Sequence, residues 1–237
     1  MKRWRALLAA AVFFYFGAAH VAFGGNVSYG ISRKIVALTF DDGPRPEVLK
    51  KLLPELEARG IKGTFFVNCF QLQSGAVKKI VREMAQNGHS IQNHTYGHGD
   101  MRKMEKKFGR AWVLRDIDRC SDEIARVTGE RPKFLRPPFW SIWRDLREDI
   151  ERHGLTVVDL RVDINSEDYL WVTRETERHR VKENVLREIT ARERAGKTAH
   201  IVVFHEIRGT VAILPEVIEA LQARGYEFGT VEEVWGR

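Results

Sequence analysis

Short apolar strands alternate with amphipathic helices along almost the whole of this 237-residue chain. Runs of β-branched and aromatic residues predict seven strands, over 35–40, 64–68, 90–93, 133–136, 156–161, 201–205 and 226–231. Helical periodicity lies between most of them, over 46–59, 77–86, 110–127, 181–194 and 213–224. The alternation predicts a parallel sheet, either closed as a barrel or open and doubly wound. The chain has no internal repeat or flexible linker, so we expect one domain after its first residues.

The first 24 residues have the layout of an export signal. Lys2, Arg3 and Arg5 precede an uncharged, mostly apolar run over 6–19, and small residues follow it. The apolar stretch 6–25 also reaches the roughly 20 residues that a bilayer span needs. Residues 1–24 are therefore predicted to be a signal peptide or an N-terminal membrane anchor, with a buried core helix as the third alternative. Residues 25–237 are predicted to be the exported domain, in the periplasm, outside the cell or anchored on the outer side of a membrane.

The net charge of +7 suggests a nucleic-acid partner at first sight, but its distribution does not. Three of the 39 basic residues lie in the N-terminal segment, which leaves 36 against 32 acidic residues, a net charge of +4. That surplus is spread over predicted helical faces such as 102–107 and 174–180. We expect no nucleic-acid partner, and membrane contact through the N-terminal segment only.

Side chains suited to catalysis follow the predicted strands at their C-terminal ends. In chain order they are Asp41, Asp42, His94, His98, Arg136, Asp163, Asp168 and His205. The C-terminal ends of parallel strands share one face of the sheet, where the active sites of α/β proteins are built. The sequence therefore predicts that these residues belong to one site.

His94 and His98 are four residues apart just after a strand, so one turn can direct both rings at one ion. A carboxylate from the Asp41-Asp42 pair would complete two imidazoles and one carboxylate, with room for water, as catalytic zinc sites require. A polar loop is the plainer interpretation of the histidines, and Asp42 could instead cap the helix that follows. Two adjacent carboxylates repel each other, however, and a nearby cation would stabilise them.

Four motifs occur in order along the chain: TFDDGP at 39–44, HTYGH at 94–98, RPPF at 136–139 and IVVFH at 201–205. Together they resemble the motifs of nodulation-type polysaccharide deacetylases, carbohydrate esterase family 4, and the resemblance extends from about residue 34 to residue 234. It implies a distorted (β/α) barrel with about seven parallel strands. It also implies metal-dependent removal of N-acetyl groups from an amino-sugar polysaccharide or oligosaccharide.

The resemblance also implies a role for each matching residue. Asp41 would be the catalytic base, positioned by Arg136, and His205 would be the general acid. The metal ligands would be Asp42, His94 and His98, and the divalent ion would most often be zinc. The backbone N–H of Phe139 would help bind the oxyanion. These roles suit an acetamide, whose hydrolysis needs an activated water and a proton for the departing nitrogen.

Two stretches depart from the family pattern. The loop over 165–169 reads NSEDY where the family usually has Asp-Trp. We assign the orientation of His205 to Asp168, with Asp163 as the rival, and expect Tyr169 to replace the tryptophan as a groove wall. Trp140 is predicted to be a stacking platform for a sugar, with helix packing over 141–152 as the alternative.

The two cysteines leave one question open. Cys69 and Cys120 could form a disulfide in an oxidising compartment, but Cys120 lies inside a predicted helix. Its position favours two free thiols.

Two other functions fit parts of the sequence. The chain could be an amidase acting on small cyclic imides or ureides, or a non-catalytic carbohydrate-binding protein on the same scaffold. Export argues against the first, and a complete set of base, acid and ligands argues against the second. The sequence leaves open which polymer is used, with chitin oligomers, peptidoglycan and an exported polysaccharide all compatible.

Overall fold

A computed structural model describes residues 33–171 and 174–235 of the chain, and the predicted signal peptide or anchor lies outside these residues. Within the described part, none of the helices is both long and apolar enough to cross a bilayer. The strands of this part are β1 (Ile35–Gly43), β2 (Thr64–Val67), β3 (Ser90–Asn93), β4 (Phe134–Leu135), β5 (Thr156–Val157), β6 (Asp163–Asn165), β7 (Ala199–His205) and β8 (Glu227–Gly229).

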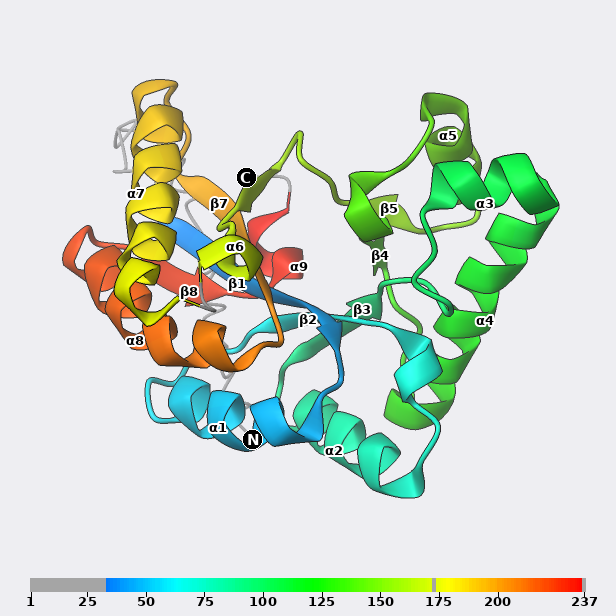
Figure 1. Ribbon diagram of the computed structural model, residues 1–237, viewed down its shortest axis with the longest axis horizontal. Helices are drawn as coiled ribbons and strands as arrows, with labels where there is room; N and C mark the ends of the chain where they lie inside the picture. Colours follow the sequence, from blue (N-terminus) through cyan, green and yellow to red (C-terminus); the bar gives the residue numbers. More distant parts are fainter. Residues whose placement is uncertain (1–32, 172–173, 236–237) are drawn as a thin grey trace, which may run out of the picture. The chain divides into compact units, whose positions relative to one another are not determined.

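The strands form one parallel sheet that curls into a half-barrel (Figure 1). Their order is β5-β4-β3-β2-β1-β7-β6, and β8 pairs with the first residues of β1. No strand pairing in the described residues joins β5 to β6, so the barrel stays open there. The predicted distorted barrel is confirmed, but the single strand expected over 156–161 is wrong. The chain leaves the sheet in a turn in which the Asp159 carbonyl accepts the N–H groups of Val162 and Asp163, both at 2.9 Å.

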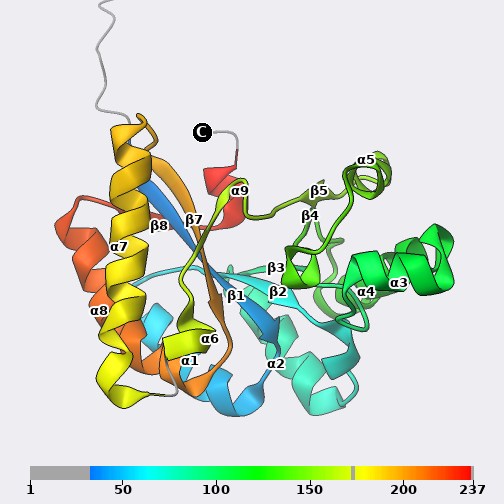
Figure 2. The same ribbon diagram turned by 45° about the horizontal axis from the view of Figure 1, so that its top comes forward.

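Helices cover the outer face of the sheet (Figures 1 and 2), where α4 (Arg110–Thr128) contacts β3, and α7 (His179–Arg194) contacts β6 and α8 (Arg208–Ala223). The α-helices are α1 (Pro46–Glu57), α2 (Gly75–Gln86), α3 (Met101–Phe108), α4 (Arg110–Thr128), α5 (Arg144–Arg152), α6 (Asp168–Trp171), α7 (His179–Arg194), α8 (Arg208–Ala223) and α9 (Val231–Val234). The 3₁₀ turns are η1 (Cys69–Gln71), η2 (Pro138–Trp140) and η3 (Glu175–Glu177). The helix predicted to start at residue 213 begins at Arg208 instead. Gly109, with φ of 82°, separates α3 from α4, a backbone conformation that glycine adopts without strain.

The alternation of side chains along β1 divides the core from the site. Val36, Leu38 and Phe40 face outward and pack in the main core beneath the helices. Ile35 and Ala37 face the inside of the curl, where Val231 of α9 packs against them. The next inward residues are Thr39 and Asp41, which contact a buried arginine. Apolar side chains thus fill the N-terminal end of the barrel, and polar ones line its C-terminal end.

A disulfide joins Cys69 of η1 to Cys120 of α4, with their Cα atoms 5.3 Å apart. The prediction of two free thiols is therefore wrong. A position inside a helix does not isolate Cys120, because the buried face of α4 that carries it packs directly against η1.

Candidate active site

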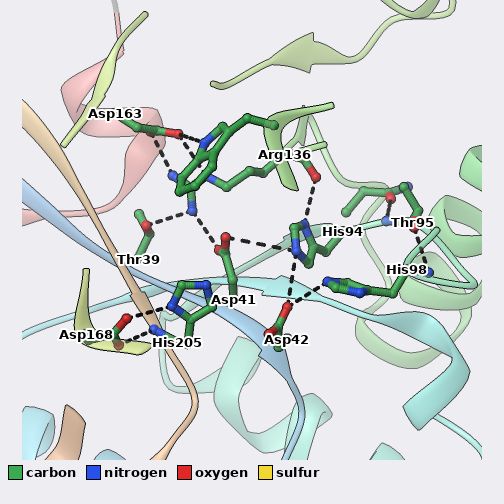
Figure 3. Close-up of polar contacts among 12 residues, drawn as sticks. Thr39, Asp41, Asp42, His94, Thr95, His98, Arg136, Asp163, Asp168 and His205 are labelled. Carbon is green, nitrogen blue, oxygen red and sulfur yellow. Dashed lines mark hydrogen bonds and ion pairs between the residues drawn. The ribbon is translucent and has the colours of Figure 1, made fainter. Parts of the chain in front are cut away.

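A cavity of about 440 Å³ lies at the C-terminal ends of the strands. It is lined by Asp41, Asp42, His94, His98, Pro137, Phe139, Trp140, Tyr169 and His205. The catalytic side chains expected from the sequence therefore gather in one place, with Arg136, Asp163 and Asp168 held behind them (Figure 3).

Asp42, His94 and His98 direct one ligand atom each at a common point, and these atoms all lie within 4.8 Å of one another. The Oδ1 atom of Asp42 is 2.8 Å from His98 Nε2 and 3.4 Å from His94 Nε2. Burial alone would raise the pKa of Asp42, but hydrogen bonds from the two imidazoles hold it well below its ordinary value, so the carboxylate is ionised.

The surroundings of these three residues also suit a metal. His94 Nδ1 lies 2.7 Å from the backbone oxygen of Arg136, a second contact that fixes the ring and leaves Nε2 for an ion. Two imidazoles and one carboxylate leave coordination positions for water and substrate. The residues therefore fit a divalent metal ion.

Backbone strain is concentrated in the same loops. In the described part of the chain, the non-glycine residues with positive φ are Asp42, Thr95, His98, Phe139, Trp140 and Glu167. Asp42 lies in the last residues of β1, and the other five follow β3, β4 or β6 at the site end of the barrel. Such conformations cost on the order of 1–3 kcal/mol each and persist where the surrounding structure holds them. Their clustering marks these loops as the functional edge of the sheet.

Arg136 lies fully buried between two aspartates. Its Nη1 donates to Asp41 Oδ1 at 2.7 Å and to Thr39 Oγ1 at 2.8 Å. Its Nε and Nη2 donate to the two oxygens of Asp163 at 3.0 and 2.8 Å. The guanidinium also stacks on Phe66, 4.0 Å from the ring centroid. Packed on every side, Arg136 fixes the orientation of Asp41.

Asp168, and not its rival Asp163, contacts His205. Its Oδ1 lies 2.7 Å from His205 Nδ1, and its Oδ2 accepts the backbone N–H of the same histidine at 2.7 Å. Thr210 donates its hydroxyl to Asp168 as well. Burial would lower the pKa of His205, but Asp168 outweighs burial and raises it to about 9.

Two exposed rings flank the cavity. Phe139 is 65% exposed, and its ring centroid lies 5.1 Å from that of His98. Tyr169 is 46% exposed, and its ring lies 5.3 Å from that of His205. Trp140 also lines the cavity, but its indole N–H donates to Asp163 Oδ2 at 3.3 Å, so it supports the buried Arg136 cluster as well.

Sequence reasoning missed several supporting residues. Thr39 could have been predicted from the sequence, because residues two apart in a strand lie on the same face and Thr39 is two residues before Asp41. Gln71 donates to the backbone oxygen of Asp42 at 2.6 Å, a contact between distant segments that no local pattern reveals.

Glu206 is another residue to which the sequence analysis assigns no role. It is buried, accepts the backbone N–H of Arg45 at 2.8 Å, and has its pKa raised to about 8 by burial. Its carboxyl group occupies the space where a side chain on Gly43 would begin, so the glycine is required there.

Comparison with known proteins agrees with this geometry. Residues 29–158 match the family described as polysaccharide deacetylase. The chain is 30% identical over 202 residues to the peptidoglycan-N-acetylglucosamine deacetylase of Bacillus cereus, covering 84% of this chain and 68% of that protein. It is 29% identical over 207 residues to the chitin deacetylase of Colletotrichum lindemuthianum, covering 85% and 79%.

Solved structures extend the likeness to three dimensions. The chitin deacetylase from the same fungus superposes with a TM-score of 0.76 at 27% identity, over 86% of this chain and 88% of that one. A family 4 acetyl xylan esterase from Clostridium thermocellum, in complex with cobalt, gives 0.70 at 27% identity, over 85% and 90%. With the sequence match, the shared fold and the metal-ligand geometry in agreement, the chain belongs to the polysaccharide deacetylase family, carbohydrate esterase family 4.

Proposed function

We propose that this protein is an exported, metal-dependent hydrolase that removes N-acetyl groups from an amino-sugar glycan. One observation carries the proposal: a carboxylate beside an arginine and a histidine beside an aspartate both line the cavity that contains three metal-type ligands. A carbohydrate-binding protein would need neither an oriented base nor an oriented acid.

Asp42, His94 and His98 would hold the divalent ion, and their donor set favours zinc. When bound, such an ion polarises a carbonyl oxygen and lowers the pKa of water. The remaining chemistry belongs to the protein's own side chains.

Asp41 is the proposed general base. Its ion pair with Arg136, at 2.7 Å, fixes the direction of its oxygens. Asp163 takes two of the hydrogen bonds of the same guanidinium. The guanidinium is therefore held between two carboxylates, and its position toward Asp41 is fixed.

His205 is the proposed general acid. A pKa of about 9 keeps its imidazole protonated at neutral pH, ready to donate to the nitrogen that leaves. The backbone N–H of Phe139 is the proposed donor to the oxyanion, in the strained turn that follows Arg136. Asp168 acts by orienting His205.

The substrate is proposed to be an N-acetylated glycan. The exposed rings of Phe139 and Tyr169 on two sides of the cavity suit the apolar faces of sugar rings. The named relatives act on chitin and on peptidoglycan, and both polymers carry N-acetyl groups that fit the proposed chemistry. Export is supported by the Cys69–Cys120 disulfide, which is typical of oxidising compartments.

Acetate release tests the proposal. Chitin oligomers, peptidoglycan, another N-acetylated polysaccharide, acetylated xylan and a small cyclic imide would be offered to the protein before and after chelation and after zinc is restored. We expect acetate from at least one N-acetylated glycan, lost with the chelator and regained with zinc. Release from acetylated xylan alone would make the protein an esterase. Ring opening of the imide alone would make it an amidase, and no turnover at all would favour a binding protein.

A further inference from the structure

The loop over 94–98 carries two of the three proposed metal ligands in an unfavourable backbone conformation. Thr95 has φ of 65° and His98 has φ of 52°. Residues with a Cβ atom adopt this region only at a conformational cost. Within the loop, Thr95 Oγ1 accepts the backbone N–H of His98 at 3.0 Å, and contacts from neighbouring elements hold the loop as well.

One such contact comes from Asp116, a half-buried residue of α4. Its Oδ2 accepts the backbone N–H of Tyr96 at 3.0 Å and that of Gly97 at 3.3 Å. A single carboxylate therefore accepts hydrogen bonds from the two backbone amides that directly precede His98. Hydrogen bonds to a charged acceptor are stronger than those between neutral groups, so this carboxylate helps to offset the strain.

The helix that carries Asp116 is itself fixed against the loop. Asn93, just before the loop, donates to the Ile117 carbonyl at 2.9 Å and to Ser121 Oγ at 2.8 Å. On the other side, η1 donates its Cys69 and Phe70 N–H groups to the carbonyls of Thr95 and Tyr96, at 3.2 and 2.9 Å.

The two supports are joined covalently, because Cys69 of η1 is bonded to Cys120 of α4. The loop is thus clamped between two elements that a disulfide keeps together. Within this clamp, Asp116 supplies the charged contact.

We propose that Asp116 is a positioning residue of the metal site, which acts through the backbone of Tyr96 and Gly97 to hold His98 in its ligating conformation. The inference rests on metal binding in the proposed function and is independent of the glycan used. Asp116 touches neither the ion nor the substrate, so its loss should weaken metal binding and should change the geometry of the bound metal.

The test compares Asp116→Ala, Asp116→Asn and a matched control, Asp118→Ala, each in the full-length protein. Asp118 lies on the same helix two residues away, but its partners within 4.0 Å are Arg131 and His153, far from the loop in the sequence. Cobalt(II) is the probe, because competition with a chelator gives its Kd and its absorption spectrum reports ligand geometry.

We expect Asp116→Ala to raise the cobalt Kd about 10–100-fold, the usual effect of losing a residue that supports a metal ligand, and to alter the spectrum. Asp116→Asn should lie between this variant and the wild type, because its amide oxygen still accepts hydrogen bonds without the charge. Asp118→Ala should match the wild type. If Asp116→Ala does not fold, Asp116→Ser takes its place, since its short hydroxyl cannot reach both amides.

A folded Asp116→Ala protein with wild-type affinity and spectrum would overturn this inference alone. An equal loss in Asp118→Ala would also overturn it, because the effect would then be general destabilisation of α4. A wild-type protein that binds no cobalt would overturn the proposed function together with the inference.

Discussion

His205 Nδ1 lies 2.7 Å from Asp168 Oδ1, and the carboxylate that holds it is completely buried. The contact fixes the ring of the proposed acid and stabilises its protonated form. Asp168 makes this contact although the loop over 165–169 reads NSEDY, where the family usually has Asp-Trp.

Asp168→Asn should make the proposed acid lose its proton at lower pH. The pKa of His205 is raised to about 9 against burial by the hydrogen bond and charge of Asp168, so removing that charge lowers it. The alkaline limb of the kcat profile should move to lower pH, measured as acetate release between pH 6 and 10. An alkaline limb that stays in place would show that His205 is not the group that titrates there.

Asp41→Asn should lower turnover by about 10²–10⁴-fold, the usual contribution of a general base. The amide keeps the size of the side chain and can still accept a hydrogen bond from Arg136, so the metal content should be unchanged. Acetate release and elemental analysis of the same preparation check both points. Wild-type turnover would remove Asp41 from the mechanism.

His94→Ala should abolish stoichiometric metal binding, because it removes one of three converging ligand atoms. His153→Ala is the matched control, since that imidazole is about half exposed at the end of α5. Elemental analysis after dialysis compares the two. Full occupancy in the His94→Ala protein would exclude this residue as a ligand.

The Cys69→Ala, Cys120→Ala double variant should lower the free energy of unfolding by about 2–4 kcal/mol, because the disulfide closes a loop between residues 51 apart. Urea unfolding of the wild type with and without a reductant provides the comparison. Reductant should bring the wild type to the variant's midpoint and leave the variant unchanged. Equal stability of both proteins without reductant would mean that the bond does not form.

His200→Gln should flatten the pH dependence of stability below neutrality. Burial, and then the charge of Arg192, lowers the pKa of His200 to about 4, against 6.5 for the unfolded chain. The unfolded state therefore binds the proton first, and the histidine's contribution, present above pH 6.5, is lost as the pH falls toward 4. The variant should lose roughly 1–3 kcal/mol less than the wild type over this range, measured by urea unfolding at each pH. Parallel curves would show that folding does not lower the pKa of His200.

Local patterns were sufficient for a parallel α/β sheet and for the gathering of the site, whereas the choice of a distorted barrel came from the family resemblance. The period of two in the strands and their order along the chain place Asp41, His94 and His205 at one edge. Each motif is a short segment at a strand end, so its residues need only local geometry to come together. The family resemblance supplied roles that spacing alone cannot.

The remainder depends on contacts between distant segments. Arg136 pairs with Asp163, which is 27 residues away in the sequence, and Cys69 is bonded to Cys120, which is 51 residues away. The strand predicted over 156–161 ends at Val157, because a turn around Asp159 competes with β propensity. No periodicity within a single segment encodes such choices.

The inward direction of alternate residues in β1 limits how this protein can vary. Ile35, Ala37, Thr39 and Asp41 all face the same side, so inserting one residue anywhere between Ile35 and Asp41 would reverse those on one side of the insertion. Either Ile35 and Ala37, which pack against α9, or the Asp41 carboxylate beside Arg136 would then turn toward the outer helices. Insertions and deletions that homologues tolerate should therefore avoid this strand and occur in loops, such as the connection between β5 and β6.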